Sequence, residues 1–152
     1  AAATPHRRDG IALDVIVQPP EGTGAGEPSA PRRAEILHGL GNVIENAVQF
    51  CKSRGEVAVS WDNHLVMIEI TDDGPGVAPS ILVRLGEPYV SSRRKSGGMG
   101  LGVFIAKTLL ERTGATISFF NGHQHGARIV ITWPRYVLEA LGADRRDLNV
   151  NV

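Results

Sequence analysis

The chain has one cysteine and no long apolar run among its 152 residues. A single thiol, Cys51, excludes an internal disulfide framework and leaves too few thiolates for a zinc cluster. No stretch approaches the roughly 20 apolar residues of a membrane-spanning helix, and the first ten residues lack the apolar centre of a signal peptide. We therefore expect a soluble domain that makes no membrane contact of its own.

An excess of one charge is also lacking, because 16 basic and 16 acidic residues cancel. Such a chain has no general attraction for nucleic acid, so any anion site must be local. The length and the 42% hydrophobic content suffice for one core but not for two typical domains. We expect one globular domain, which can be a piece of a larger protein.

Apolar patterns and turn residues predict five strands and two longer helices. Runs rich in β-branched residues and bounded by turn residues indicate strands at 10–17, 56–61, 65–72, 115–121 and 127–133. Apolar residues three and four apart predict helices over 32–53 and 101–112, the second ended by Gly114; Pro79 starts a short helical stretch over 79–87, and the residues after Arg135 can form one more helix. Because strand-helix-strand alternation does not repeat, this order favours an α+β two-layer sandwich with helices on one face of a mixed, mostly antiparallel sheet of about five strands.

Glycines are concentrated in the stretch SGGMGLGVFIAK, which leads from a polar loop into the second long helix. Glycine permits sharp turns and close approach, and a helix N-terminus offers free N–H groups to an anion. The spacing of Gly98, Gly100 and Gly102 matches neither the dinucleotide fingerprint nor the Walker pattern. On its own it also fits a tight loop that closes onto a helix.

A second glycine pattern, DDGPG, follows an apolar strand. It places the carboxylate of Asp72 beside a turn in which Gly74 and Gly76 leave bare backbone for a flat group. A carboxylate accepts a hydrogen bond from an exocyclic amine, which adenine has and guanine lacks at the equivalent ring position. A simple Asp-Gly turn is the alternative interpretation.

Two asparagines, Asn42 and Asn46, are four residues apart and so lie on one side of the first long helix. Asparagine is a mediocre residue for a helix interior, so the pair calls for a reason. A side-chain carbonyl can ligate Mg²⁺, and an amide can donate to phosphate. Two solvent-facing amides are the alternative.

Four segments in this order resemble the N, G1, G2 and G3 boxes of the catalytic, ATP-binding domain of bacterial sensor histidine kinases: NVIENAVQF, DDGPG, GMGLG and GARIVITWP. That domain has the Bergerat fold and belongs to the GHKL superfamily, with the gyrase, Hsp90 and MutL ATPases. The match spans about two thirds of the chain, from Glu35 to Pro134. The run EILHGLGNVIENAVQF, with GEPYVSS before the glycines, looks most like the RegB/PrrB type of redox-sensing kinases.

The resemblance implies a Mg-ATP site with a mobile lid. Asn46 would ligate Mg²⁺, Asn42 would lie near the phosphates, and Asp72 would bind the adenine amine. The nucleotide-binding residues it implies are Asn42, Asn46, Asp72, Gly74, Gly76, Tyr89, Gly98, Gly100, Leu101 and Gly102.

The chain also departs from the family pattern. Tyr89 can serve as one of the two phenylalanines of the F box, but Gly86 replaces the other, and Gln49 occupies a position that is often basic in relatives. Three basic residues of the expected lid are candidate phosphate contacts that would compensate for the missing basic residue at position 49: Arg93, Arg94 and Lys95.

The resemblance further implies a kinase rather than a hydrolase. Hydrolytic relatives carry a glutamate general base where this chain has Asn42, and an asparagine cannot take a proton. We therefore expect the γ-phosphoryl group to pass to a nucleophile of another domain, with no catalytic residue within the chain. Neither His6 nor His38 fits the family's H box, and His123 and His125 are expected in a solvent-exposed turn.

The implied partners are ATP, the kinase's own dimerisation and histidine-phosphotransfer domain, and a response regulator reached through the full-length protein. The location implied is the cytoplasm, as a domain of a membrane-anchored kinase. Gly86, Gln49 and the missing H box keep open a degenerate nucleotide-sensing or protein-interaction domain without phosphotransfer, and a GHKL ATPase is a further alternative.

Composition and the resemblance together set the expected boundaries. They are a disordered or artificially added N-terminus (1–9), the ATP-binding domain (10–134) with a Gly/Pro/Ser-rich flexible loop (19–31) and an ATP lid (86–98), and a C-terminal tail (135–152). Cys51 falls on the apolar face of the first long helix, so we expect a buried structural thiol and not a redox centre.

Overall fold

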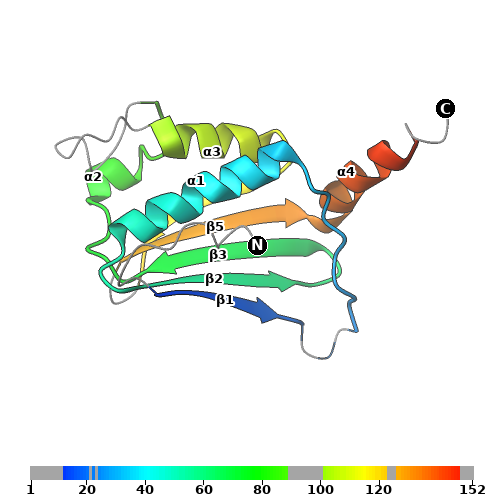
Figure 1. Cartoon of the computed structure of the whole chain (residues 1–152), viewed down its shortest axis with the longest axis horizontal. Coiled ribbons are helices and arrows are strands. Elements are labelled where there is room, and N and C mark those ends of the chain that lie inside the picture. Colours follow the sequence, from blue (N-terminus) through cyan, green and yellow to red (C-terminus); the bar gives the residue numbers. More distant parts are fainter. Residues whose placement is uncertain (1–11, 21, 23, 89–100, 123–125, 148–152) are drawn as a thin grey trace.

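The computed structural model describes residues 12–20, 22, 24–88, 101–122 and 126–147. In these residues a sheet carries two long helices, α1 and α3, on one of its faces (Figure 1). The elements in chain order are β1 (Ala12–Gln18), α1 (Ala34–Phe50), β2 (Arg54–Trp61), β3 (Leu65–Asp72), α2 (Pro79–Leu82), α3 (Leu101–Glu111), β4 (Thr116–Asn121), β5 (Ala127–Pro134) and α4 (Arg135–Asp147).

The sheet has five strands in the order β1-β2-β3-β5-β4. β1 pairs with β2 in parallel, and the other neighbours are antiparallel. A parallel pair needs a crossover, which the loop after β1 and the helix α1 supply. The predicted two-layer sandwich with a mixed, mostly antiparallel sheet is confirmed.

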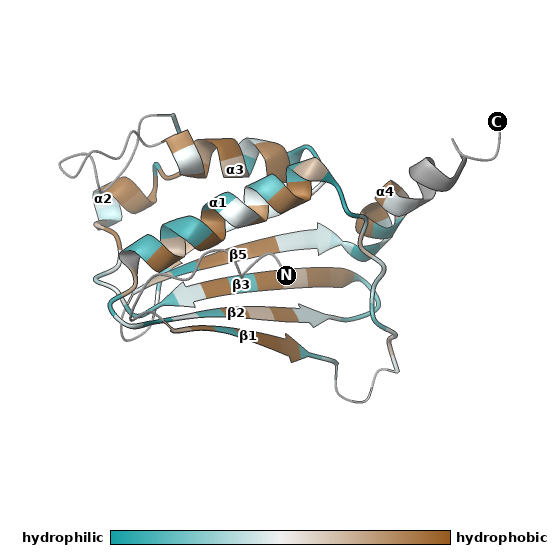
Figure 2. Cartoon of the chain, viewed as in Figure 1, coloured by the Kyte–Doolittle hydropathy of each residue, from teal (hydrophilic) through white to brown (hydrophobic). Residues whose placement is uncertain are grey.

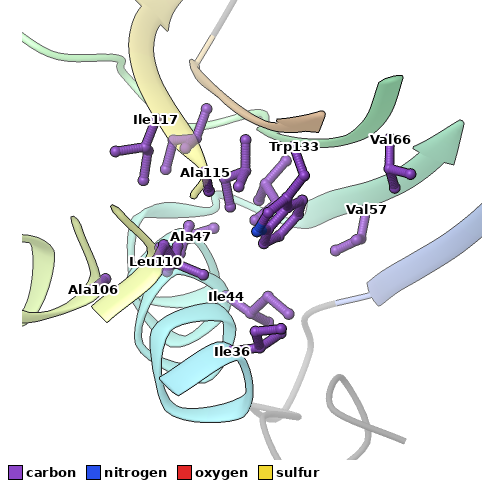
Figure 3. Packing of buried hydrophobic residues seen from close by; sticks show 14 of the residues in the cluster. Ile36, Ile44, Ala47, Val57, Val66, Ala106, Leu110, Ala115, Ile117 and Trp133 are labelled. Atoms are coloured by element: carbon purple, nitrogen blue, oxygen red, sulfur yellow. The ribbon is translucent and has the colours of Figure 1, made fainter. Parts of the chain in front are cut away.

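The core lies between α1, α3 and the inner face of the sheet. Strand residues such as Trp133 and Val57 point toward α1 residues such as Ile44, and Leu110 of α3 meets the same cluster (Figure 3). Apolar segments recur along the central strands and both long helices in Figure 2. The largest side chains that are less than 2% exposed are Trp133, Ile70, Leu110, Ile131 and Val43.

The end of α3 is fixed by two features. Gly114 has a φ of 89°, and the N–H groups of Gly114 and Ala115 donate to the carbonyls of Glu111 and Leu110 at 3.0 and 3.3 Å. This is the bonding pattern of a Schellman motif, so the predicted helix end at Gly114 is confirmed. The indole N–H of Trp133 also donates to the hydroxyl of Thr113 at 2.9 Å, which ties this helix end to β5.

The short helix that starts at Pro79 ends sooner than the sequence predicts. Only Pro79–Leu82 is helical. The chain then continues in turns, since Arg84, Leu85 and Glu87 each donate from N–H to the carbonyl three residues back. Such bonding tightens the backbone and ends the α-helix.

Residues after Pro134 pack onto the domain through α4. Leu138 is 3% exposed and belongs to the core cluster. The guanidinium of Arg135 donates to the carbonyls of Gly26 and Asp62 at 2.7 and 2.9 Å and to the carboxylate of Glu139 at 2.8 Å. Arg135 thus joins the loop before α1, the β2–β3 turn and α4. No helix within the described ranges has the length and apolar character needed to cross a membrane.

The side chain of Cys51, just after α1, is 7% exposed. Burial, with smaller contributions from the negative charges of Asp72 and Asp73, raises the pKa of its thiol to about 11. The thiol therefore stays protonated at neutral pH, as suits the buried structural residue that we predicted.

Candidate functional site

The predicted site residues that the structure describes lie on elements that meet at one end of the molecule. The C-terminal half of α1, the end of β3, α2 and the start of α3 all lie at the left of Figure 1. The carboxylate of Asp73, just after β3, accepts hydrogen bonds from the N–H groups of Lys52 and Ser53, just after α1, at 2.8 and 3.0 Å. These bonds fix the end of α1 beside the end of β3.

Asp72 is the last residue of β3, and its carboxylate is half-buried. One oxygen, Oδ1, accepts hydrogen bonds from the N–H groups of Gly74 and Ala127 at 2.9 and 3.2 Å. Oδ2 makes no hydrogen bond with another described residue. Desolvation raises the pKa of this carboxyl despite the two N–H donors. The carboxylate is therefore held in place with one oxygen available to accept a further hydrogen bond.

Asp73 has a different role. Besides the two N–H groups, the hydroxyl of Ser53 donates to it at 2.6 Å. These bonds, led by that of the Ser53 hydroxyl, hold the pKa of Asp73 well below its usual range. Because both oxygens are engaged within the protein, Asp73 supports the fold, and Asp72 is the one of the two that can bind a ligand.

The turn after Asp72 depends on glycine. Gly76 has a φ of 75°, and a Cβ added there would lie 2.8 Å from Oδ1 of Asn121. Across the β4–β5 turn, Gly126 has a φ of 76°, and a Cβ there would overlap the main-chain carbonyl of Asp72. Gly74 is buried. Gly76 and Gly126 thus let the turn after β3 approach the β4–β5 turn closely.

Asn42 and Asn46 are partly exposed along one edge of the buried stripe of α1. Val43 and Ala47, the residues that follow them, are 1% and 3% exposed. Neither asparagine side chain makes a hydrogen bond with another residue that the structure describes. Both amides are therefore available to a ligand, whereas Glu45 between them is exposed.

The start of α3 bears the last two described candidates. Leu101 is partly buried, and Gly102 is exposed, where an added Cβ would meet no described atom within 4 Å. The remaining candidates lie outside the described residues: Tyr89, Arg93, Arg94, Lys95, Gly98 and Gly100, as do His6, His123 and His125.

Gly86, which breaks the family's F-box pattern, has a structural explanation. It is buried with a φ of 93°, and a Cβ added there would lie 2.6 Å from Cδ of Lys107. A phenylalanine at this position would need both a different backbone conformation and a different place for the Lys107 stem.

Sequence reasoning assigned no site role to Asn121 or to Gly126, although Gly126 is the first residue of the segment GARIVITWP. Both lie at the β4–β5 turn, and both contact the segment 72–77 from about 45–55 residues away in the chain. No short motif links the two segments. The antiparallel pairing of β3 with β5 and of β5 with β4 is what brings them together.

Comparison with known proteins identifies this arrangement. Residues 32–137 match the family model described as histidine kinase-, DNA gyrase B- and HSP90-like ATPase. The sensor histidine kinase RegB of Cereibacter sphaeroides is 39% identical over 153 residues, which cover 88% of this chain and 33% of that protein. The sensor protein RstB of Escherichia coli is 32% identical over 99 residues, or 62% of this chain and 23% of that one. The resemblance to the RegB type is confirmed, and the chain spans about a third of the length of the RegB relatives it matches.

Two solved structures share the fold. The mycobacterial sensor histidine kinase MprB superposes with a TM-score of 0.66 at 23% identity, covering 86% of each chain. Full-length ShkA, solved in complex with AMPPNP, gives a TM-score of 0.60 at 25% identity over 80% of this chain and 25% of that one.

Proposed function

The chain belongs to the histidine kinase-, DNA gyrase B- and HSP90-like ATPase family, and from that premise we propose that it binds Mg-ATP as the catalytic domain of a sensor histidine kinase. The observation that carries the proposal is the carboxylate of Asp72, which is half-buried beside a glycine turn with one oxygen free of bonds to described residues. That oxygen accepts a hydrogen bond from the exocyclic amine of adenine, and the turn from Gly74 to Gly76 shapes the pocket for the flat ring.

The phosphates lie toward α1 and the start of α3 in this proposal. The amide of Asn42 donates to a phosphate, and Gly98, Gly100, Leu101 and Gly102 form the glycine-rich entry to α3. Arg93, Arg94 and Lys95 of the lid would contact the phosphates and Tyr89 would cover part of the nucleotide, as the family resemblance implies; these four residues lie outside the described ranges. The described parts of this set, Asn42, Leu101 and Gly102, are at least partly exposed.

Asn46 is the residue proposed to hold Mg²⁺. Its amide oxygen is the hard type of donor that this ion prefers, and it makes no hydrogen bond with another described residue. Mg²⁺ generally rests on one or two protein oxygens together with substrate phosphates, so a single amide fits that chemistry. When bound, the ion would neutralise charge on the phosphates during transfer.

The reaction proposed is donation of the γ-phosphoryl group of ATP to a histidine on a separate dimerisation domain, followed by relay to an aspartate of a response regulator. The bond from the γ-phosphorus to the β–γ bridging oxygen breaks as the bond to the histidine nitrogen forms. This chain contributes positioning of the phosphates, which together with electrostatic stabilisation accounts for nearly all of the catalysis in phosphoryl transfer. RegB, its relative, is named a sensor histidine kinase, which supports this assignment.

The placement in a larger protein is part of the same proposal. Residues 10–134 form the ATP-binding domain with its lid at 86–98, and the domain works in the cytoplasm as part of a membrane-anchored kinase. The match over residues 32–137 supports the extent of the domain, and the 33% of RegB that the chain covers supports its place in a longer protein.

Calorimetric titration with Mg-ATP tests the nucleotide site. We expect binding in the micromolar to millimolar range, abolished by Asp72→Asn and weakened by Asn46→Asp. Asp14→Asn is the matched control, because Asp14 forms an exposed ion pair with Arg54 at 2.6 Å on β1, and such pairs contribute little. No binding by the unchanged domain at millimolar Mg-ATP would refute the proposal.

A degenerate domain that senses nucleotide without phosphotransfer is the second candidate, motivated by Gly86 and Gln49. Joining the natural upstream segment and assaying transfer from γ-labelled ATP decides between the two. Acid-labile label on protein excludes the second candidate, and ATP binding without label excludes the kinase. Release of phosphate without labelled protein would instead indicate an ATPase.

A further inference from the structure

The side chain of Asn121, at the end of β4, holds the main chain of Val77 by two hydrogen bonds. Its Nδ2 group donates to the carbonyl of Val77 at 2.8 Å, and the N–H of Val77 donates to its Oδ1 at 2.8 Å. An amide side chain offers a donor and an acceptor side by side, so this pair copies the bonding of a neighbouring strand. Val77 directly follows Gly76, so Asn121 fixes the point at which the DDGPG turn ends.

The start of the same turn is fixed from the same hairpin. The N–H of Ala127, the first residue of β5, donates to Oδ1 of Asp72 at 3.2 Å. Gly122 donates from its N–H to the carbonyl of Gly126 at 2.9 Å, which holds the two strands of the hairpin together there. The paired strands β4 and β5 therefore hold both ends of the turn, Asp72 through Ala127 and Val77 through Asn121.

We propose that Asn121 is a positioning residue for recognition of the base, which rests on the nucleotide site proposed above. The Asp72 carboxylate accepts a hydrogen bond from the adenine amine while the glycine turn lies against the ring. Selectivity for adenine over guanine therefore depends on the distance between the carboxylate and the turn. Asn121 acts on that distance through Val77 and touches no part of the nucleotide. Fixing the turn before binding removes an ordering cost that the ligand would otherwise meet.

The contacts predict that removing this clamp affects binding more than folding. Asn121 and Val77 lie at the surface, where water can replace both hydrogen bonds in the variant. The turn would still form, but its glycines would let it sample other positions relative to Asp72.

Asn121→Ala tests the inference, with Asn63→Ala in the exposed β2–β3 turn as the matched control. Affinity for Mg-ATP is measured by calorimetry, affinity for Mg-GTP by competition against ATP, and folding by thermal melting. We expect Asn121→Ala to weaken ATP binding about tenfold, because the free energy of about one hydrogen bond no longer goes into ordering the turn before binding. We also expect the ratio of ATP affinity to GTP affinity to fall. Asn63→Ala should leave both affinities unchanged.

Asn121→Asp separates positioning from mere filling of space. This side chain has the same shape and keeps the acceptor for the Val77 N–H, but its carboxylate faces the Val77 carbonyl without a donor. We expect a narrowed ATP preference here too, whereas charge repulsion of the phosphates alone would weaken ATP and GTP by the same factor. This variant also decides the matter if Asn121→Ala does not fold.

The outcomes separate the two proposals. If the unchanged domain binds ATP and both variants keep its ATP-over-GTP preference, Asn121 has no positioning role. If the unchanged domain binds no ATP, the nucleotide site itself is refuted, whatever the variants do.

Discussion

The carboxylates of Asp72 and Asp73 are adjacent in the chain, but the protein shifts their pKa values in opposite directions. Burial raises the pKa of Asp72, and hydrogen bonds led by that of the Ser53 hydroxyl lower the pKa of Asp73. The first carboxyl faces the proposed base site, and the second joins the ends of α1 and β3. As the pH falls, Asp72 at the proposed site therefore takes up a proton before Asp73, which supports the fold.

Nucleotide affinity should fall with acidification while the domain is still folded. Asp72 has a folded pKa above the value of about 3.9 in unfolded chains, so it takes up a proton first and loses the charge that attracts the amine. Its protonation also relieves the cost of burial, so it does not unfold the domain. The affinity for ADP is measured by calorimetry below about pH 6, where the nucleotide's own phosphate has already taken up its proton, and folding is followed by circular dichroism. Affinity that stays constant until unfolding would contradict it.

Asp73→Asn should destabilise the domain at neutral pH because it weakens hydrogen bonds to a charged acceptor, but by less than the roughly 1.5–3 kcal/mol typical of such bonds, since water screens this partly exposed carboxylate. The folded pKa of Asp73 lies below its unfolded value, so its contribution is complete above about pH 3.9 and is lost as the pH falls toward the folded pKa. Urea unfolding of both proteins should therefore give free energies that converge in acid. A difference that is constant with pH would show that the charge is irrelevant.

Gly39→Ala should destabilise the domain because α1 and α3 touch at this glycine. An added Cβ would lie 2.7 Å from Cγ and 2.9 Å from Cδ2 of Leu110, which is fully buried. Overpacking costs about 1–3 kcal/mol, more than the gain of up to about 1 kcal/mol from replacing glycine in a helix.

Gly142→Ala is the matched control for that substitution. Among the described residues, the one atom within 4 Å of a Cβ added at this position of α4 is Cβ of Pro31, at 3.8 Å, so the helix preference should act alone and stabilise the domain. Urea unfolding of both variants gives the comparison. Equal and favourable changes would mean that α1 and α3 are not in close contact at Gly39.

Thr113→Val should cost about 1–3 kcal/mol, although it replaces one methyl-sized group by another. The hydroxyl of Thr113 accepts a hydrogen bond from the Trp133 indole at 2.9 Å and donates one to the Leu110 carbonyl at 2.6 Å. All three residues are buried. Valine leaves the indole N–H without this partner. Thr116→Val is the control, because Thr116 is an exposed residue of β4, and denaturant midpoints with unchanged slopes provide the measurement. Equal stability of the two variants would show that the two hydrogen bonds of the Thr113 hydroxyl do not stabilise the domain.

The sequence was sufficient for what depends on nearby residues. Periodicity placed α1 and β3, and the helix end at Gly114 followed from one glycine after an apolar run, because these are local properties of the chain. The clamp of Asn121 on Val77 joins residues 44 apart and depends on strand order, which no local pattern encodes. The same holds for Arg135, whose partner carbonyls at Gly26 and Asp62 carry no side-chain signature.

Gly86 shows how a departure from a family motif can be structural. Replacing it by phenylalanine would bring the chain closer to the F-box pattern, yet we expect Gly86→Phe to destabilise the domain. The φ of 93° costs a residue with a side chain about 1–2 kcal/mol, and the Cβ would meet the Lys107 stem at 2.6 Å. Gly86→Ala isolates these two costs from those of the ring.

Combining each variant with Lys107→Ala separates conformation from contact. Removing the lysine stem should recover the steric part of the loss and leave the part due to φ, so Gly86→Ala should remain destabilising in that background. Urea unfolding of the unchanged domain, Lys107→Ala, Gly86→Ala and the double variant measures the coupling for alanine, and Gly86→Phe with its double variant gives the same cycle for phenylalanine. Full recovery would mean that the backbone at residue 86 relaxes without cost, and the glycine would then be required only by its neighbour Lys107.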